Sequence, residues 1–339
     1  HCCVSNTCCV LRCNTTGYEN VAVGFAALQK NSTGIRNTAV GSYALFNNTT
    51  GNYNVALGRE SLCANTTGVD NTAIGYESLK ANTTGINNVA VGYAALNNNT
   101  IGIDNVAVGF QALSQNTTGV DNTAIGKNAG ANMSTGFRNS ILGRSGGESI
   151  STGDQNTAIG FHALRSNQSS DKNTALGAYS LLLATGGFNI GIGKGAGSNI
   201  TSGAGNIIIG TNDISADSAT GNRQLKIAGN DGSTTTTWLS GDSSGNLVTT
   251  GDLTLANDKK VIFGDAGEHI AGDGTSLVIT ASNQLHLMPA GRLGIGTTSP
   301  AKQVQIAATT SNQPFLRIET TDGGNKRLEA TLSIGEISC

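Results

Sequence analysis

Charged and aromatic side chains are scarce in this chain of 339 residues. Asp, Glu, Lys and Arg make up 12% of it, with a formal net charge of −2, and aromatic residues contribute 4%. Binding of nucleic acid needs a basic surface that neutralises phosphates, and this balance does not provide one. We therefore expect no nucleic acid partner.

Long apolar runs and catalytic patterns are also missing. No stretch of about 18 apolar residues is present to span a bilayer, so we expect no membrane insertion. His162 and His269 have no Ser/Asp constellation at a useful spacing, and the Gly-rich segment 191–197 lies inside a repeat rather than at the start of a helix. Asp104 and Asp121, in adjacent repeats, belong to a column of mixed composition that is better explained as a solvated face than as paired catalytic carboxylates. We expect no enzyme, no metal site and no cofactor.

An asparagine repeats at every seventeenth position, and each is followed four residues later by glycine. The repeat asparagines are Asn20, Asn37, Asn54, Asn71, Asn88, Asn105, Asn122, Asn139, Asn156 and Asn173, and after one step of sixteen residues Asn189 and Asn206 continue the run. Most of the twelve units read Asn-(Thr/Val)-Ala-(Val/Ile/Leu)-Gly. A fixed period sustained this long predicts a solenoid, in which each unit stacks on its neighbours.

The composition of each unit predicts β-structure. Short β-branched runs such as 21–23 and 207–209 are bounded by glycine or by Asn-Thr-Thr-Gly. Each unit is therefore interpreted as one coil of an all-β parallel solenoid, or β-roll. Two strands per coil are expected, one from Asn-Thr-Ala-Ile-Gly and a weaker one around the Ala-Leu pair.

Two aliphatic columns are predicted to fill the core. The first lies three residues after the repeat asparagine and comprises Val23, Val40, Leu57, Ile74, Val91, Val108, Ile125, Leu142, Ile159 and Leu176. The second lies eight residues after it and comprises Leu28, Leu45, Leu62, Leu79, Leu96, Leu113 and Leu164. Where Gly130, Gly147 and Gly197 replace that leucine, Met133, Ile150 and Ile200 appear three residues later, which indicates a second way of filling the core.

The alternation of side chains along a strand then predicts an outward row of alanines. This alanine row is Ala22, Ala39, Ala56, Ala73, Ala90, Ala107, Ala124, Ala158 and Ala175. A thin coil buries little apolar area, so lateral association is expected to supply the rest, and closed cyclic symmetry would limit it. The alanine row is the candidate interface of a homotrimer.

Other columns have structural explanations. The glycine three residues before each repeat asparagine, as in Gly34 and Gly51, is expected to close a turn at positive φ. The stacked asparagines are expected to form a hydrogen-bonded ladder along the solenoid axis.

The unit Asn-Thr-Ala-Ile-Gly, followed by Ala-Leu and a Gly-containing turn, resembles the YadA-like head repeat of trimeric adhesins, a left-handed parallel β-roll. Similar repeats occur in phage tail-fibre proteins and in fibre proteins of large viruses. The resemblance covers residues 14–210 and repeats twelve times. It implies an obligate parallel homotrimer with a role in adhesion.

The composition of the remaining segments predicts further modules on both sides of the solenoid. Residues 1–13 form a Cys-rich segment, 14–210 the solenoid, 211–250 a transition that contains Trp238, 251–300 a β-rich shaft and 301–339 a C-terminal β segment. Short alternating strands are expected at 253–255, 260–263, 276–279 and 284–287. The shaft resembles that of phage and viral fibres. Neither sustained heptads nor terminal amphipathic membrane strands appear, which favours a virion fibre over a bacterial adhesin.

Cysteines are concentrated at the ends of the chain. Those proposed for interchain disulfides are Cys2, Cys3, Cys8, Cys9, Cys13 and Cys339, while Cys63 lies in a coil. An odd number of cysteines suits crosslinks between subunits. Free thiols and a metal site remain alternatives, although the spacing matches no zinc signature.

Two further columns suggest contacts with sugars. Eleven Asn-x-Ser/Thr sequons occur, and the candidate glycosylation sites are Asn14, Asn31, Asn48, Asn65, Asn82 and Asn116, although the turn itself favours Asn-Thr-Thr-Gly. An aromatic row five residues after the repeat asparagine comprises Phe25, Tyr76, Tyr93, Phe110 and Phe161. Stacking between coils or contact with carbohydrate would explain this row.

The sequence as a whole predicts a fibre protein on a virion surface or in an extracellular location. Its expected partners are two further copies of itself, a host-surface receptor or glycan, and other virion or filament subunits. Three alternatives remain: a filament subunit crosslinked through its terminal cysteines, a fragment of a bacterial trimeric adhesin, and, more remotely, a surface depolymerase.

Overall fold

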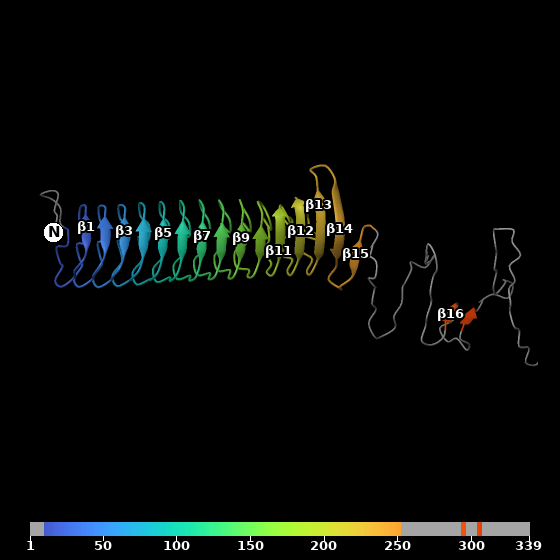
Figure 1. Cartoon of the computed structure of the whole chain (residues 1–339), viewed down its shortest axis with the longest axis horizontal. Coiled ribbons are helices and arrows are strands. Elements are labelled where there is room, and N and C mark those ends of the chain that lie inside the picture. The colour runs from blue at the N-terminus through green and yellow to red at the C-terminus, as the bar shows by residue number, and fades with distance from the viewer. Residues whose placement is uncertain (1–9, 252–292, 296–303, 307–339) are drawn as a thin grey trace, which may run out of the picture. The chain divides into compact units, whose positions relative to one another are not determined.

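A computed structural model describes residues 10–251, 293–295 and 304–306 of the chain. The chain divides into two compact units after Ala256. The first contains a single sheet of fifteen strands whose spatial order follows the sequence (Figure 1). The strands are β1 (Val21–Val23), β2 (Thr38–Val40), β3 (Val55–Leu57), β4 (Thr72–Ile74), β5 (Val89–Val91), β6 (Val106–Val108), β7 (Thr123–Ile125), β8 (Ser140–Leu142), β9 (Thr157–Ile159), β10 (Thr174–Leu176), β11 (Ile190–Lys194), β12 (Ile207–Asn212), β13 (Leu225–Asn230), β14 (Thr235–Gly241) and β15 (Leu247–Thr249).

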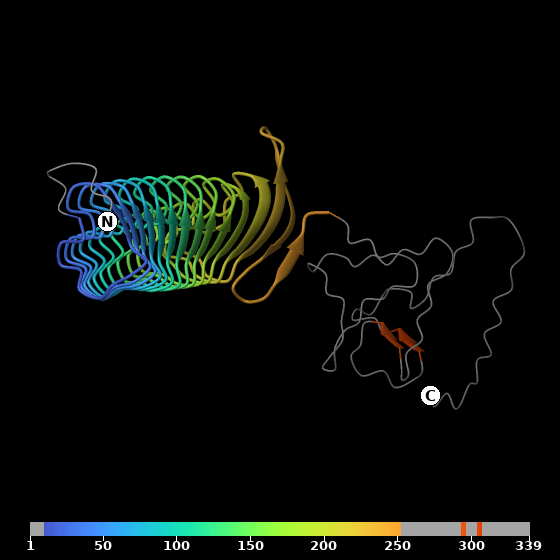
Figure 2. The ribbon, with the colours of Figure 1, turned by 60° about the vertical axis from the view of Figure 1, so that its left-hand side comes forward.

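The predicted parallel β-solenoid is confirmed. Strands β1 to β13 pair in parallel, with each residue opposite its equivalent in the next coil, as Ala73 is opposite Ala90. Figure 2 shows the coils stacked one behind another along the first unit. The turns are bonded from coil to coil as well, as when the backbone N–H of Leu96 donates to the carbonyl oxygen of Ala112 at 3.0 Å. Every coil therefore depends on its neighbours for most of its backbone hydrogen bonds.

Each coil contains one strand, so the prediction of a second strand around the Ala-Leu pair is wrong. That pair lies in a turn in which two residues are left-handed, for example Ala94 at φ 51° and Leu96 at φ 49°. A third left-handed residue precedes the repeat asparagine, as Asp104 does at φ 58°. Such backbone cannot continue a strand, and it closes the coil within seventeen residues.

The prediction of which strand residues face inward is also wrong. From Ala39 to Ala175 the members of the alanine row are fully buried, and Ala22 in the first coil is partly buried. The aliphatic residues three after the repeat asparagine point outward instead, with Val23 43% and Leu142 47% exposed. The alanine row is therefore part of the core, and it cannot be the contact surface between chains.

The narrow coil explains why alanine lies inside. The leucines eight after the repeat asparagine are buried, as predicted, and they reach across the coil to the strand. A Cβ on Gly130 would lie 3.0 Å from Ile141 Cδ1 and from Leu113 Cδ2. Where the larger Ile141 occupies the strand position, the flanking leucines are replaced by Gly130 and Gly147, so the two rows share one limited space.

The predicted second way of filling the core is confirmed. Met133, Ile150 and Ile200 are fully buried, each in a coil that has glycine in place of the leucine. Beside Gly197, the Cδ1 atom of Ile200 would lie 3.1 Å from an added Cβ. The long side chain from the neighbouring turn therefore occupies the space that the leucine would fill.

The asparagine ladder is confirmed, and a second ladder accompanies it. Nδ2 of Asn88 donates to Oδ1 of Asn71 at 3.1 Å and to the carbonyl oxygen of Gly102 at 2.8 Å. The second ladder runs through the Asn-Thr-Thr-Gly turns, where Nδ2 of Asn99 donates to Oδ1 of Asn82 at 2.8 Å. It ends at Asn116, because Met133 takes the next place, and the Oδ1 atom of Asn116 has no hydrogen-bond partner in the described residues.

The glycine of the Asn-Thr-Thr-Gly turn is needed for close approach rather than for positive φ. Gly51 is not left-handed, but a Cβ there would collide with the carbonyl oxygen of Gly68. Positive φ occurs instead at the glycine that follows each of β1 to β10, as in Gly58 at 140°.

The transition segment continues the sheet before reversing it. Gln224 replaces the repeat asparagine, and its backbone N–H donates to Oδ1 of Asn206 at 2.9 Å. Strands β14 and β15 then pair antiparallel, in contrast to all the preceding coils.

In the second unit, β16 (Leu293–Ile295) pairs in parallel with β17 (Val304–Ile306). The other strands predicted for the shaft, at 253–255, 260–263, 276–279 and 284–287, lie outside the described residues, as does most of the C-terminal segment 301–339.

Candidate interaction surfaces

The outward side of the sheet is an apolar surface, which we call the strand face. It consists of the first and third residues after each repeat asparagine in β1 to β12. The third residue is aliphatic in every coil, and the first is Val, Ile, Thr or Ser. Leu225 and Ile227 of β13 extend it in register with Ile207 and Ile209.

The strand face is large for a surface in contact with water. Three residues of strand span about 10 Å and twelve strands about 58 Å, so the face covers roughly 600 Å². Soluble monomers rarely expose a contiguous apolar patch of more than a few hundred Å². Its members are half-buried or exposed throughout, with Val21 50% exposed.

The aromatic row borders the strand face, and its rings stack from coil to coil. Tyr93 lies between Tyr76 and Phe110, with ring centroids 5.3 Å and 5.0 Å apart and interplanar angles of 13° and 9°. Arg59 lies over Tyr76 at 5.6 Å and Lys127 over Phe110 at 5.4 Å, so a cation covers each end of the stack. Only the ring edges remain for a ligand.

The other two members of the aromatic row are also engaged by neighbours. Phe25 meets Tyr43 edge to face at 5.3 Å, and Phe161 stacks on His162 at 3.9 Å. Burial lowers the pKa of His162, with a smaller effect from the charge of Arg165. This packing favours coil-to-coil stacking, while contact with carbohydrate at this row stays a prediction.

Most candidate glycosylation sites are inaccessible. Asn31, Asn48, Asn65, Asn82 and Asn116 are fully buried members of the second ladder. Asn14 is partly buried and donates to the carbonyl oxygen of Gly17 at 2.9 Å. A glycan on a buried ladder amide would displace its hydrogen bonds and its neighbours, so the prediction of glycosylation at these five sites is wrong for the folded coil.

Charged residues in the solenoid form local pairs. Lys80 Nζ lies 2.8 Å from Oε2 of Glu60 and from Oε1 of Glu77. The hydrogen bond from Lys80 holds the pKa of Glu60 below its usual range. Asp104 accepts a hydrogen bond from Asn87, and Asp121 lies 3.6 Å from Arg138, so each of these two carboxylates has a neighbouring partner.

The described thiols are unpaired. Cys13 is exposed and Cys63 is half-buried, and burial raises the pKa of Cys63. The other cysteines proposed for disulfides, Cys2, Cys3, Cys8, Cys9 and Cys339, lie outside the described residues. Within residues 10–251, no group of three or more His, Cys, Asp or Glu side chains could hold a metal ion.

Comparison with known proteins adds no relative. No family model, curated protein or solved structure matches the chain. In the part of the chain that the structure describes, no helix has the length and apolar character needed to cross a bilayer.

Proposed function

We propose that this chain is a structural and adhesive fibre protein that assembles as a parallel homotrimer through its strand face. The observation that carries the proposal is the outward aliphatic row, one Val, Ile or Leu in each of twelve coils in register, with Val, Ile, Thr or Ser beside it. Roughly 600 Å² per chain comes near the ~800 Å² that each partner buries in a typical stable interface.

Three copies are the expected number. Flat sheets that face a common threefold axis bury all their strand faces in a closed assembly, and such closure prevents open-ended growth. The resemblance to trimeric adhesin heads supports the same number and the parallel orientation. This interface replaces the alanine row, which is buried within each coil.

A rod of this kind serves to space or present a binding surface. Its backbone hydrogen bonds join one coil to the next along the whole stack of coils, which suits a spacer. We assign the rod to a virion surface or another extracellular setting, with a host-surface receptor or glycan as its partner.

The molar mass in solution tests this proposal. Light scattering on the purified chain, with and without reductant, is expected to give a discrete particle of three chains in both conditions. A single chain at micromolar concentration would overturn it. Open-ended ladders that collapse on reduction would instead favour a filament crosslinked through cysteines such as the exposed Cys13.

A further inference from the structure

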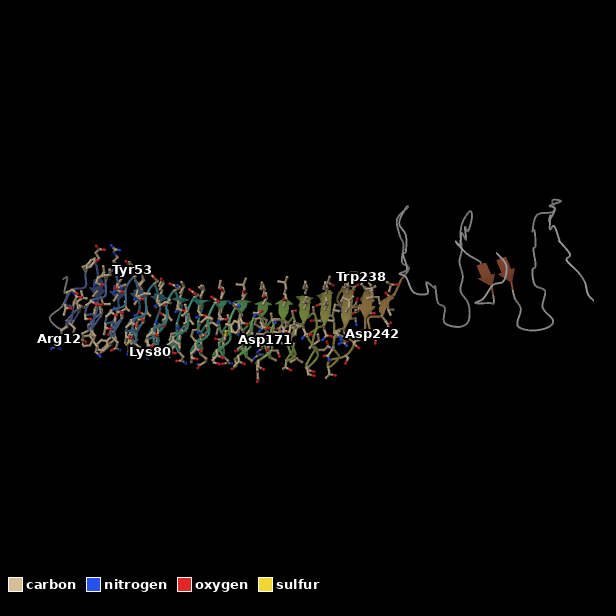
Figure 3. All side chains as sticks on the ribbon, turned by 90° about the horizontal axis from the view of Figure 1, so that it is seen from below. Arg12, Tyr53, Lys80, Asp171, Trp238 and Asp242 are labelled. Carbon is tan, nitrogen blue, oxygen red and sulfur yellow. The ribbon has the colours of Figure 1, made fainter. Side chains whose placement is uncertain are left out.

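The only tryptophan of the chain stands on the antiparallel end of the sheet. Trp238 lies in β14 and is 56% exposed, and Figure 3 labels it at the C-terminal end of the stacked coils. It sits at the irregularity in the β13–β14 pairing, between Leu239, which is opposite Ile227, and Thr237, which is opposite Ala228. A β-bulge of this kind re-aims a side chain out of the regular pleat.

The backbone beneath the indole is adapted to it. Gly229 of β13 lies under the six-membered ring, and a Cβ there would come within 2.8 Å of Trp238 Cη2 and 2.9 Å of Cζ2. Glycine therefore lets the ring lie flat against the strand. Trp combines a flat apolar ring with a polar N–H and is enriched at surfaces where it is partly accessible to a partner.

A hollow of about 560 Å³ opens beside the ring. Its lining consists of Thr211, Gly229, Asn230, Asp231, Thr234, Thr236 and Trp238. The hollow is shallow and open, so a ligand there would lie against the ring rather than be enclosed. A second hollow of about 360 Å³ shares Thr236 and Trp238 with the first, so the indole stands between two open spaces.

The polar groups of the lining are held in place before any ligand arrives. Oδ1 of Asp231 accepts from the backbone N–H groups of Ser233 and Thr234, both at 2.9 Å, and from the Ser233 hydroxyl at 3.0 Å. Oδ2 is left able to accept a hydrogen bond from a ligand. The amide of Asn230 donates to the Thr235 hydroxyl at 2.9 Å, which fixes the other side of the loop.

We propose that this hollow is a binding site for a neutral saccharide, with one pyranose ring stacked on Trp238. A sugar combines an apolar C–H face with a rim of hydroxyls, and this lining combines one flat ring with hydroxyl, amide and carboxylate groups. The carboxylate of Asp231 disfavours an acidic sugar. A quaternary ammonium ligand is disfavoured as well, because the lining has one aromatic ring rather than a cage of several.

The site lies at the border of the strand face. Ala228 of β13 pairs with Gly210 of β12, so the next residue, Gly229, continues the register beside Thr211. Thr211 lies two residues after the outward-facing Ile209. On its other side, Gly229 pairs with Thr236 of β14. Assembly through the strand face therefore leaves the hollow at the rim. The inference deepens the proposed adhesive function and rests on it for its biological use.

Because Trp238 is the only tryptophan, its fluorescence reports on this site alone. The full chain is titrated with neutral trisaccharides of glucose, galactose, mannose and N-acetylglucosamine, and with sialyllactose and choline. At least one neutral trisaccharide is expected to shift the emission saturably with a Kd of about 1 mM or below, as for a small ligand on an open site. If none does so at about 10 mM, or if only choline or sialyllactose does, the inference is overturned.

Variants locate the binding, and calorimetry reads those that lack the indole. Trp238→Ala is expected to weaken binding at least about tenfold, Trp238→Phe to restore part of the loss, and Gly229→Ala to weaken it by displacing the ring. Unchanged affinity in Trp238→Ala would contradict the assignment. The chain mass is measured on the same samples, so that loss of the sugar site with intact trimers is distinguished from failure of assembly. If Val91→Asp with Val108→Asp moves the emission to the red without any sugar, a second copy covers Trp238, and the site is refuted.

Discussion

At the scale of single residues, buried amides are as regular a part of this core as apolar side chains are. The repeat asparagines and the ladder asparagines of the turns are almost all fully buried, and most of them bond to their equivalents in the neighbouring coils. A buried amide is tolerated only when its polar atoms are paired. Asn116 is the exception, because its Oδ1 faces the place where Met133 ends the ladder.

The end of the second ladder allows a matched comparison. Asn99 donates to Asn82 and Gly102 and accepts from Asn116, whereas Asn116 only donates. Asn99→Ala is therefore expected to lower the free energy of unfolding by about 1–2 kcal/mol more than Asn116→Ala. Chemical denaturation of both variants measures the difference, and equal losses would contradict the assigned hydrogen bonding.

The carboxyl group of Asp231, which accepts the hydrogen bonds of its turn, titrates at unusually low pH. Backbone N–H groups of Thr234 and Ser233, followed by the Ser233 hydroxyl, lower the pKa of Asp231 to about 2, from an ordinary value of 3.8. A lowered pKa means that this stabilisation is complete above pH 3.8 and is lost as the pH falls toward 2. The amide resonances of Ser233 and Thr234 should therefore titrate with a midpoint near 2. A midpoint at the ordinary value, or the same titration in Asp231→Asn, would disprove the turn.

At the scale of the element, three left-handed residues close each coil. They are rarely glycine: within one coil they are Gln111, Leu113 and Asp121, at φ 53°, 48° and 58°. Each left-handed residue with a side chain costs about 1–2 kcal/mol, which the buried leucine and the coil-to-coil hydrogen bonds must offset.

Two glutamines four residues apart separate this backbone effect from the effect of the side chain. Gln111 is left-handed and Gln115 is not. Glycine at 111 is expected to be neutral or stabilising by up to about 1 kcal/mol, while Gln115→Gly should destabilise by about 0.5–1 kcal/mol. Valine at 111 should destabilise by about 1–2 kcal/mol and more than at 115. Thermal unfolding of the four variants, glycine and valine at positions 111 and 115, measures these differences. If the two substitutions changed stability in the same order at both positions, the assigned turn would be contradicted.

The sequence predicted the coil and the first ladder because both depend on strict columns. Seventeen-residue spacing and a repeated asparagine require the same neighbours in every unit, whatever the turn geometry. The left-handed turns were missed because residues such as Ala94 and Leu96 give no sign of positive φ. A second strand was therefore expected where the chain turns.

The sequence-based prediction exchanged the inward and the outward row. In a strand of three residues, either the middle residue or the two flanking ones can face inward, and here both sets contain apolar residues. Size favoured the aliphatic row as core, yet the leucine opposite leaves room only for alanine. One signal in the sequence was available. Ile141 takes the alanine position in a coil where Gly147 replaces the leucine, and Gly130 replaces the leucine of the preceding coil. Likewise, Ile208 takes the alanine position in the coil after that of Gly197. A larger residue in one row therefore accompanies a glycine in the other. The hollow at Trp238 had no such signal, because it depends on a bulge and a hairpin outside the repeat.

At the scale of the whole molecule, a solenoid of thin coils leaves one side of its sheet without cover. The core of each coil is a few side chains wide, and within residues 10–251 the strand face keeps a row of aliphatic side chains partly or largely exposed. Association between copies is therefore the step that completes the burial of apolar area, and it is the central claim of this account.

Sedimentation of two matched double variants tests that claim most directly. Val91→Asp with Val108→Asp places charges on the strand face, whereas Thr67→Asp with Thr84→Asp places them on exposed turns. We predict that the first pair sediments as folded single chains, because desolvating the six interfacial charges of a trimer would exceed what the interface supplies, while the second pair remains trimeric like the wild type. Trimers that persist unchanged in the first pair, with the circular dichroism of both pairs intact, would show that the strand face is not the surface on which the chains associate.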